Sequence, residues 1–163
     1  VEGCFNFSRV VGVVVEHRDP PDVRLSFEAA AHAGEPLQPV AHQGFPDRRV
    51  VAVFQPHLYS RTHNFMDEFA RAFFNADQLV LTDVYGAREA PIEGVSGARL
   101  AERAEQFGHR AVHYVPDKTD LPARLQAMTE AGDVVLMLGA GDIWRYSRTF
   151  VDLLKEQETE MAE

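Results

Sequence analysis

Polar and aromatic side chains follow a run of valines in the stretch that spans residues 48–62. Residues 50–54 are apolar and rich in valine, a pattern typical of a strand that is buried on both faces. Pro56 cannot donate a hydrogen bond to a sheet, so we expect the strand to stop there. Four side chains with hydrogen-bonding groups then alternate along the chain: Gln55, His57, Tyr59 and Arg61. Ligands bind at the carboxyl ends of strands in open α/β sheets, so this loop is a candidate ligand site.

Arg61 gives this loop its most specific chemistry. A guanidinium can bind a carboxylate or a phosphate with two parallel hydrogen bonds, and we expect His57 and Tyr59 to project into the same crevice. The alternative interpretation is that His57 hydrogen-bonds a carbonyl and that Arg61 forms an ion pair with a surface acid, which would contribute little. The residues alone leave both interpretations open.

Two more strand-like runs end in loops that could reach the same edge of a sheet. Residues 78–84 predict a strand, and the loop after it contains Tyr85 and Glu89. Glu89 could also form an exposed ion pair of little consequence with its neighbour Arg88. Residues 132–138 predict the most apolar strand of the chain, which leads into a glycine-containing turn.

That turn contains Gly139, Gly141 and Asp142 and opens the last predicted helix. Glycines at this position let backbone amides approach an anion at the helix N-terminus. However, Trp144 occupies the third glycine position of the dinucleotide-binding fingerprint, and Asp142 would cap the helix and repel a phosphate. A tight structural turn and a phosphate cradle therefore remain alternative interpretations.

The elements that must position these loops alternate along the chain. The expected strands are residues 10–15, 49–54, 78–84, 111–115 and 132–138. The expected helices are residues 22–33, 63–75 with Thr62 as N-cap, 97–107 with Ser96 as N-cap and Gly108 closing it, 121–131, and 143–155. This order predicts one α/β domain, a Rossmann-like, mostly parallel sheet with helices on both faces. Loops 54–62, 84–96 and 139–143 are then expected to converge, whereas residues 35–47 form a long loop and the acidic tail 156–163 is expected to fray.

Composition excludes several classes of function. A formal net charge of −9 argues against non-specific nucleic-acid binding, which needs a basic surface. The seven histidines show no metal-ligand spacing, and the single Cys4 allows no internal disulfide, which favours a reduced, cytoplasmic setting. No apolar run approaches the roughly 20 residues that span a bilayer. We expect no metal site, nucleic-acid partner or membrane partner.

From residue 49 onward the chain resembles the C-terminal domain of the Mur ligases, specifically the members that add L-alanine. The resemblance rests on three segments in order, residues 54–62, 83–96 and 132–142, and covers about two-thirds of the chain. The sequence Phe-Gln-Pro-His at residues 54–57 distinguishes these members from relatives that add other amino acids.

The resemblance implies a three-domain bacterial cytoplasmic enzyme of peptidoglycan synthesis. In such an enzyme ATP activates the carboxylate of UDP-N-acetylmuramate as an acyl phosphate, L-alanine attacks it, and Mg²⁺ neutralises charge. The N-terminal and central domains hold the sugar nucleotide, the phosphate loop and most metal ligands, so we expect ATP and Mg²⁺ to be held mainly outside this chain and the chain to be inactive alone. By resemblance, the catalytic candidates are Arg61 and His57, and the substrate-binding candidates are Gln55, Tyr59, Arg61, Tyr85 and Glu89. Residues 1–9 are interpreted as a remnant of the junction with the central domain.

The chain departs from the family upstream of residue 49. The family has Asp-Asp-Tyr-x-His-His-Pro after the first strand, whereas residues 14–20 read Val-Val-Glu-His-Arg-Asp-Pro. The tyrosine and both histidines that help to hold alanine and ATP are missing, and residues 35–46 also differ from the family. A degenerate natural copy, a local frameshift or a sequencing error would each produce such a segment.

Two other functions remain as alternatives. One is a non-catalytic binding or regulatory module that kept the fold and lost the alanine site, as the altered residues 16–19 suggest. The other is a dinucleotide-dependent oxidoreductase, which the incomplete glycine fingerprint disfavours.

Overall fold

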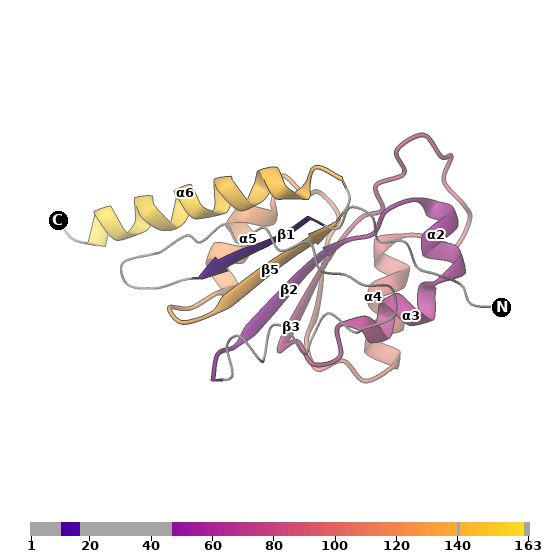
Figure 1. The fold of residues 1–163 in the computed structure, drawn as a ribbon, viewed down its shortest axis with the longest axis horizontal. Coiled ribbons are helices and arrows are strands. Elements are labelled where there is room, and N and C mark those ends of the chain that lie inside the picture. Colours follow the sequence, from indigo (N-terminus) through magenta and orange to yellow (C-terminus); the bar gives the residue numbers. More distant parts are fainter. Residues whose placement is uncertain (1–10, 17–46, 140, 162–163) are drawn as a thin grey trace.

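The described part of the chain forms one twisted sheet flanked by helices (Figure 1). The computed structural model describes residues 11–16, 47–139 and 141–161. Its strands are β1 (Val11–Glu16), β2 (Val50–Gln55), β3 (Gln78–Thr82), β4 (Val112–Val115) and β5 (Val134–Gly139). Its helices are α2 (Tyr59–Asn64), α3 (Met66–Ala72), α4 (Gly97–Gln106), α5 (Leu121–Met128) and α6 (Ile143–Met161). No helix in these ranges is long and apolar enough to cross a membrane.

The sheet has the order β1-β5-β2-β3-β4. Strand β2 pairs in parallel with β5 on one side and with β3 on the other, and β3 pairs in parallel with β4. Strand β1 pairs antiparallel with β5 at the edge. The predicted α/β, mostly parallel sheet is therefore confirmed, and the carboxyl ends of its four parallel strands meet at one edge.

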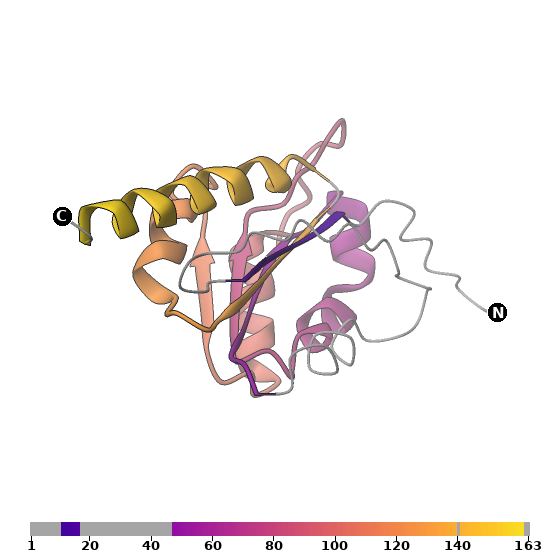
Figure 2. The same ribbon diagram turned by 60° about the vertical axis from the view of Figure 1, so that its left-hand side comes forward.

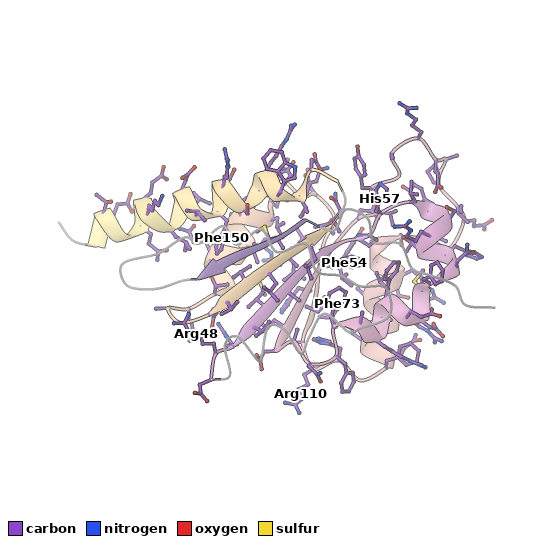
Figure 3. All side chains as sticks on the ribbon, in the orientation of Figure 1. Arg48, Phe54, His57, Phe73, Arg110 and Phe150 are labelled. Carbon is purple, nitrogen blue, oxygen red and sulfur yellow. The ribbon has the colours of Figure 1, made fainter. Side chains whose placement is uncertain are left out.

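Alternating residues of β2 enter two separate cores, which explains why the strand is apolar throughout. Val51 and Val53 pack in a core with α5 and α6, where Phe150 is fully buried. Phe54 faces the opposite core with α3 and α4, and its ring lies 4.9 Å from that of Phe73. Figures 1 and 2 show α5 and α6 on one side of the sheet and α3 and α4 on the other, and Figure 3 shows Phe54 beside Phe73. The prediction of helices on both faces is confirmed.

Several predicted boundaries are confirmed and others are wrong. Ser96 caps α4 by accepting a hydrogen bond from the Arg99 N–H at 3.1 Å, and Gly108 adopts a φ of 90° just after that helix. Thr62 is not an N-cap, because it lies inside α2 and its hydroxyl donates to the Leu58 carbonyl at 2.9 Å.

The predicted helix 63–75 is in fact two helices, since the chain turns at Phe65 between α2 and α3. The tail is helical as far as Met161, the last residue of α6, and its expected fraying stays a prediction. The third predicted strand ends earlier, at Thr82, and the helix from residue 121 ends at Met128. The predicted helix 22–33 and the predicted loop up to residue 46 lie outside the described residues.

His109 lies in the turn between α4 and β4, and its contacts predict that the stability of the fold depends on pH. Its buried ring bonds the Phe73 carbonyl through Nε2 at 2.9 Å, and its Nδ1 accepts the Ala111 N–H at 3.3 Å. The neutral ring satisfies both contacts, and burial lowers the pKa of His109 although the Phe73 carbonyl favours the charged form. The folded state then binds fewer protons than the unfolded state, so protonation favours unfolding.

We therefore expect the free energy of unfolding to decrease as the pH falls below about 6.5, the ordinary histidine pKa, until the lowered pKa of His109 is passed. Urea unfolding between pH 5 and 8 measures this decrease. His109→Gln should flatten it, whereas His113→Gln, which changes an exposed histidine, should not. Equal pH dependence in the two variants would contradict the assignment to His109.

Candidate functional site

The loops that follow β2 and β3 are joined by backbone hydrogen bonds. The Tyr85 N–H donates to the Pro56 carbonyl at 2.8 Å, and the Leu58 N–H donates to the Tyr85 carbonyl at 3.0 Å. This pairing stacks the rings of His57 and Tyr85, whose centroids are 5.7 Å apart at an interplanar angle of 19°. Figure 3 shows His57 at the strand exits, between the sheet and α2.

The turn after β5 packs directly against the same two loops. A Cβ atom added to Gly141 would lie 2.7 Å from the Gln55 Oε1 and 3.1 Å from the Tyr85 ring. A Cβ atom on Gly139 would lie 3.1 Å from the Gln55 side chain. The predicted convergence of the three loops is confirmed. Protein atoms occupy the space that a side chain at either glycine would need, as a tight turn requires, and the phosphate-cradle interpretation is untested by these contacts.

A cavity of about 420 Å³ opens where β2, β3 and β4 end. It is lined by Gln55, Thr82, Asp83, Val84, Tyr85, Pro116, Asp117 and Lys118. Gln55, which the sequence placed in the loop, is the last residue of β2 and is only 2% exposed. Among the described residues its Oε1 has no hydrogen-bond partner. A buried acceptor without a partner is costly, so a ligand with a donor group that reaches this cavity would gain a hydrogen bond.

Lys118 is a member of the site that sequence reasoning missed. Its Nζ lies 2.5 Å from Asp142 Oδ1, 5.5 Å from the centroid of the Tyr85 ring and 6.0 Å from that of Tyr146. Burial alone would raise the pKa of Asp142, but the hydrogen bond and charge of Lys118 outweigh it and keep this pKa below its ordinary value. The signal was available, because residues 116–118 follow a parallel strand in the same way as the other three loops.

Arg61 and His57 form the electropositive part of the site. Within the described residues, no ion pair of Arg61 is found, so the alternative of a surface ion pair has no support there. Burial and the Arg61 charge lower the pKa of His57, which Glu89 only partly opposes. At neutral pH, His57 is therefore a neutral ring near a guanidinium that has no ion-pair partner in the described part of the chain. This combination can attract and orient an anion.

Tyr59 and Glu89 hold the two loops together. The Tyr59 ring packs so closely on Gly86 that a Cβ atom there would lie 2.6 Å from it. The Glu89 carboxylate accepts the Ser60 N–H at 2.9 Å and the Ser60 hydroxyl at 2.6 Å, and Ser60, rather than Arg88, is its partner in the described structure. The expectation that Tyr59 and Glu89 bind substrate is untested by these contacts.

The described part of the chain contains no cluster of side chains that could bind a metal ion. No group of three histidine, cysteine, aspartate or glutamate side chains is placed to hold a metal ion there. The acidic residues around the cavity are committed to local contacts: Asp83 Oδ1 accepts the N–H groups of Val84 and Gly97, and Asp117 Oδ1 accepts the N–H and hydroxyl of Thr119.

Comparison with known proteins places this architecture in a defined family. Residues 13–141 match the family described as Mur ligase, glutamate ligase domain. A UDP-N-acetylmuramate–L-alanine ligase of Salinibacter ruber is 84% identical over 115 residues, which cover 71% of this chain and 24% of the relative. The enzymes of the same name from Geobacter sulfurreducens and Trichlorobacter lovleyi are 51% and 49% identical, over 69% and 70% of this chain and 24% and 25% of their own lengths. The chain thus spans about a quarter of the length of these curated relatives.

Proposed function

The chain belongs to the Mur ligase family, and on this premise we propose that it is the C-terminal domain of an ATP-dependent ligase that joins L-alanine to UDP-N-acetylmuramate. The names of its relatives support the substrates, and the resemblance of residues 54–62, 83–96 and 132–142 to the alanine-adding members supports the choice of amino acid. The function belongs to peptidoglycan synthesis in the bacterial cytoplasm. Because the chain spans about a quarter of its relatives, we propose that it is inactive alone.

The observation that carries this proposal is Arg61, which has no ion-pair partner among the described residues and lies near the neutral His57 after the exit of β2. A ligase of this kind must bring together anions that repel one another, namely the muramate carboxylate, the transferred phosphoryl group and the carboxylate of alanine. A fixed guanidinium can bind one of these anions with two hydrogen bonds, and its charge is most effective where water is excluded. We assign Arg61 this role, and His57 the role of orienting the same anion as a neutral donor.

ATP supplies the phosphoryl group that activates the carboxylate, and Mg²⁺ offsets its charge. The described residues offer no cluster of three metal-binding groups, so we propose that both are held mainly by the rest of the ligase. This domain then contributes positioning: Arg61 and His57 face the phosphoryl group and the amino acid from one side, next to the cavity that Gln55 and Tyr85 line.

A fusion tests the proposal. The N-terminal and central domains of the Salinibacter ruber relative would be joined to this chain in place of the relative's whole C-terminal domain. We expect the fusion to release phosphate from ATP only when both L-alanine and UDP-N-acetylmuramate are present, and the chain alone to release none. Phosphate release by the chain alone, or release by the fusion that does not depend on alanine, would contradict the proposal.

A second candidate function is a non-catalytic binding or regulatory module. It is favoured by one observation, the missing tyrosine and histidines in the altered segment at residues 14–20. Only residues 11–16 of this part of the chain are described. A fusion that folds and binds the sugar nucleotide but shows no alanine-dependent phosphate release would favour this second candidate. Restoring Asp-Asp-Tyr-x-His-His-Pro in that fusion would then be expected to restore activity.

A further inference from the structure

We propose that Glu89 is a positioning residue, whose carboxylate holds the loop after β3 against the start of α2 and so fixes His57 and Arg61 for an incoming anion. The effect on catalysis rests on the proposed function, whereas the effect on the loop does not.

Glu89 contacts Ser60 at the start of α2. Both oxygens of Glu89 are used, one by the Ser60 N–H at 2.9 Å and the other by the Ser60 hydroxyl at 2.6 Å. These bonds lower the pKa of Glu89, so the carboxylate is charged at neutral pH. Ser60 directly precedes Arg61 in α2, and Glu89 lies 29 residues away in sequence. The carboxylate therefore adds a side-chain link between the loop after β3 and the start of α2, beyond the backbone bonds of His57's neighbours to Tyr85.

The backbone between β2 and α2 is strained at Leu58. Leu58 has a φ of 66°, in the left-handed region that residues other than glycine rarely adopt. Such a conformation persists only where surrounding contacts impose it. Here the Leu58 N–H donates to Tyr85, and its carbonyl accepts the Thr62 hydroxyl and the Thr62 N–H. Glu89 adds a charge-assisted contact at Ser60, two residues after Leu58, and this contact stabilises the strained conformation of Leu58.

The strained turn also determines where the His57 ring lies. The strained turn places His57 against Tyr85 in the ring stack described above, and the Tyr59 ring packs on Gly86 beside it. The charge of Arg61 lowers the pKa of His57 and the charge of Glu89 raises it. Both side chains therefore lie close enough to act on the imidazole, and Glu89 acts on it without a direct bond.

The bonds that Glu89 makes to Ser60 favour a positioning role over substrate binding. A carboxylate with both oxygens already bonded to protein donors is a poor ligand for a further group. It would also repel the anions that Arg61 is placed to attract. By accepting the Ser60 hydrogen bonds rather than pairing with Arg61, Glu89 leaves the guanidinium available. We therefore assign Glu89 to the support of the site.

The activity test uses the fusion ligase. We expect Glu89→Ala to lower kcat/KM for alanine about tenfold, because a small misplacement of a reacting group is costly. Ser60→Ala should lower it less, because the Ser60 N–H still donates to Glu89. The double variant should lose no more than Glu89→Ala alone, since the Ser60 hydroxyl acts through Glu89. Glu89→Gln keeps an acceptor and should retain more activity than Glu89→Ala. The matched control is Glu93→Ala, which removes an exposed glutamate from the same loop and should leave activity unchanged.

A second test uses the chain alone and does not depend on catalysis. In the unmodified chain, nuclear Overhauser effects should connect the rings of His57 and Tyr85. Glu89→Ala and Ser60→Ala should weaken these effects, while Glu93→Ala should not. Removing the Glu89 charge should also lower the pKa of His57 in an NMR titration, whereas Ser60→Ala retains that charge.

The two tests separate the two proposals. If the unmodified fusion is inactive, the proposed function fails, but the nuclear Overhauser effects still decide whether Glu89 holds the loop. If the fusion is active and Glu89→Ala matches Glu93→Ala in activity and in the ring contacts, the positioning role is overturned. An additive double variant of Ser60 and Glu89 would also overturn it, because the two side chains would then act separately.

Discussion

Replacing Arg61 by alanine in the fusion ligase is expected to lower kcat/KM for alanine-dependent phosphate release by about 100-fold, the scale seen when one fixed donor to a developing negative charge is removed. The expectation follows from three observations: Arg61 has no ion-pair partner among the described residues, it lies near enough to His57 to lower its pKa, and it lies in the first turn of α2, just after a parallel-strand exit, rather than on the predicted loop. The free energy of unfolding should change little, since the guanidinium makes no ion pair in the described fold.

Two controls sharpen this experiment. Arg61→Lys keeps the charge but loses the planar pair of donors, so we expect it to recover only part of the lost activity. Arg88→Ala removes the same charge from an exposed position in the neighbouring loop and should leave kcat/KM within about twofold, because an exposed charge contributes little. Equal losses for Arg61→Ala and Arg88→Ala would mean that net charge, and not a placed guanidinium, supports the reaction.

The convergence of loops could be predicted because it depends on a rule that the sequence obeys locally. Buried strands such as β2 and β5 are apolar on both faces, so their positions and ends can be read from runs of valine and leucine. Once the strands are parallel, their carboxyl ends share an edge, and the residues that follow them must be neighbours. His57, Tyr85 and Gly141 were placed together by this argument, and they are in contact in the structure.

The parts that could not be predicted depend on contacts between distant segments. The exit of β4 could be placed at the same edge from the sequence, but the pairing of Lys118 with Asp142 could not, because the two residues are 24 apart and Asp142 was interpreted as a helix cap. The break at Phe65 likewise has no proline or glycine to signal it. Glu89 shows the same limit, because its bond to Ser60 depends on the left-handed turn at Leu58, which propensities do not predict.

The ion pair between Arg49 and Asp133 also joins segments that are distant in the sequence. Among the ion pairs of the described residues, we expect its removal to lower the free energy of unfolding most. The Arg49 Nε and Nη2 donate to the two Asp133 oxygens at 2.9 and 2.6 Å, and Nη2 also donates to the Met128 carbonyl at 3.2 Å. Asp133 also accepts the Glu130 N–H at 2.8 Å, and its side chain is 5% exposed against 31% for Arg49. The pair joins the start of β2 to the turn before β5.

Arg49→Met should therefore lower the free energy of unfolding by about 3–5 kcal/mol, because it leaves a buried carboxylate without its counter-charge. Urea denaturation at neutral pH measures this loss. The control is Arg99→Met, which breaks an ion pair of similar length, 2.6 Å, between side chains that are 61% and 56% exposed, and should cost at most about 1 kcal/mol. The double variant Arg49→Met with Asp133→Leu should recover much of the stability, since removing both charges also removes the cost of burying one alone. If Arg49→Met and Arg99→Met cost the same, burial does not govern the pair, and the link between β2 and β5 must then depend on their backbone ladder and apolar packing.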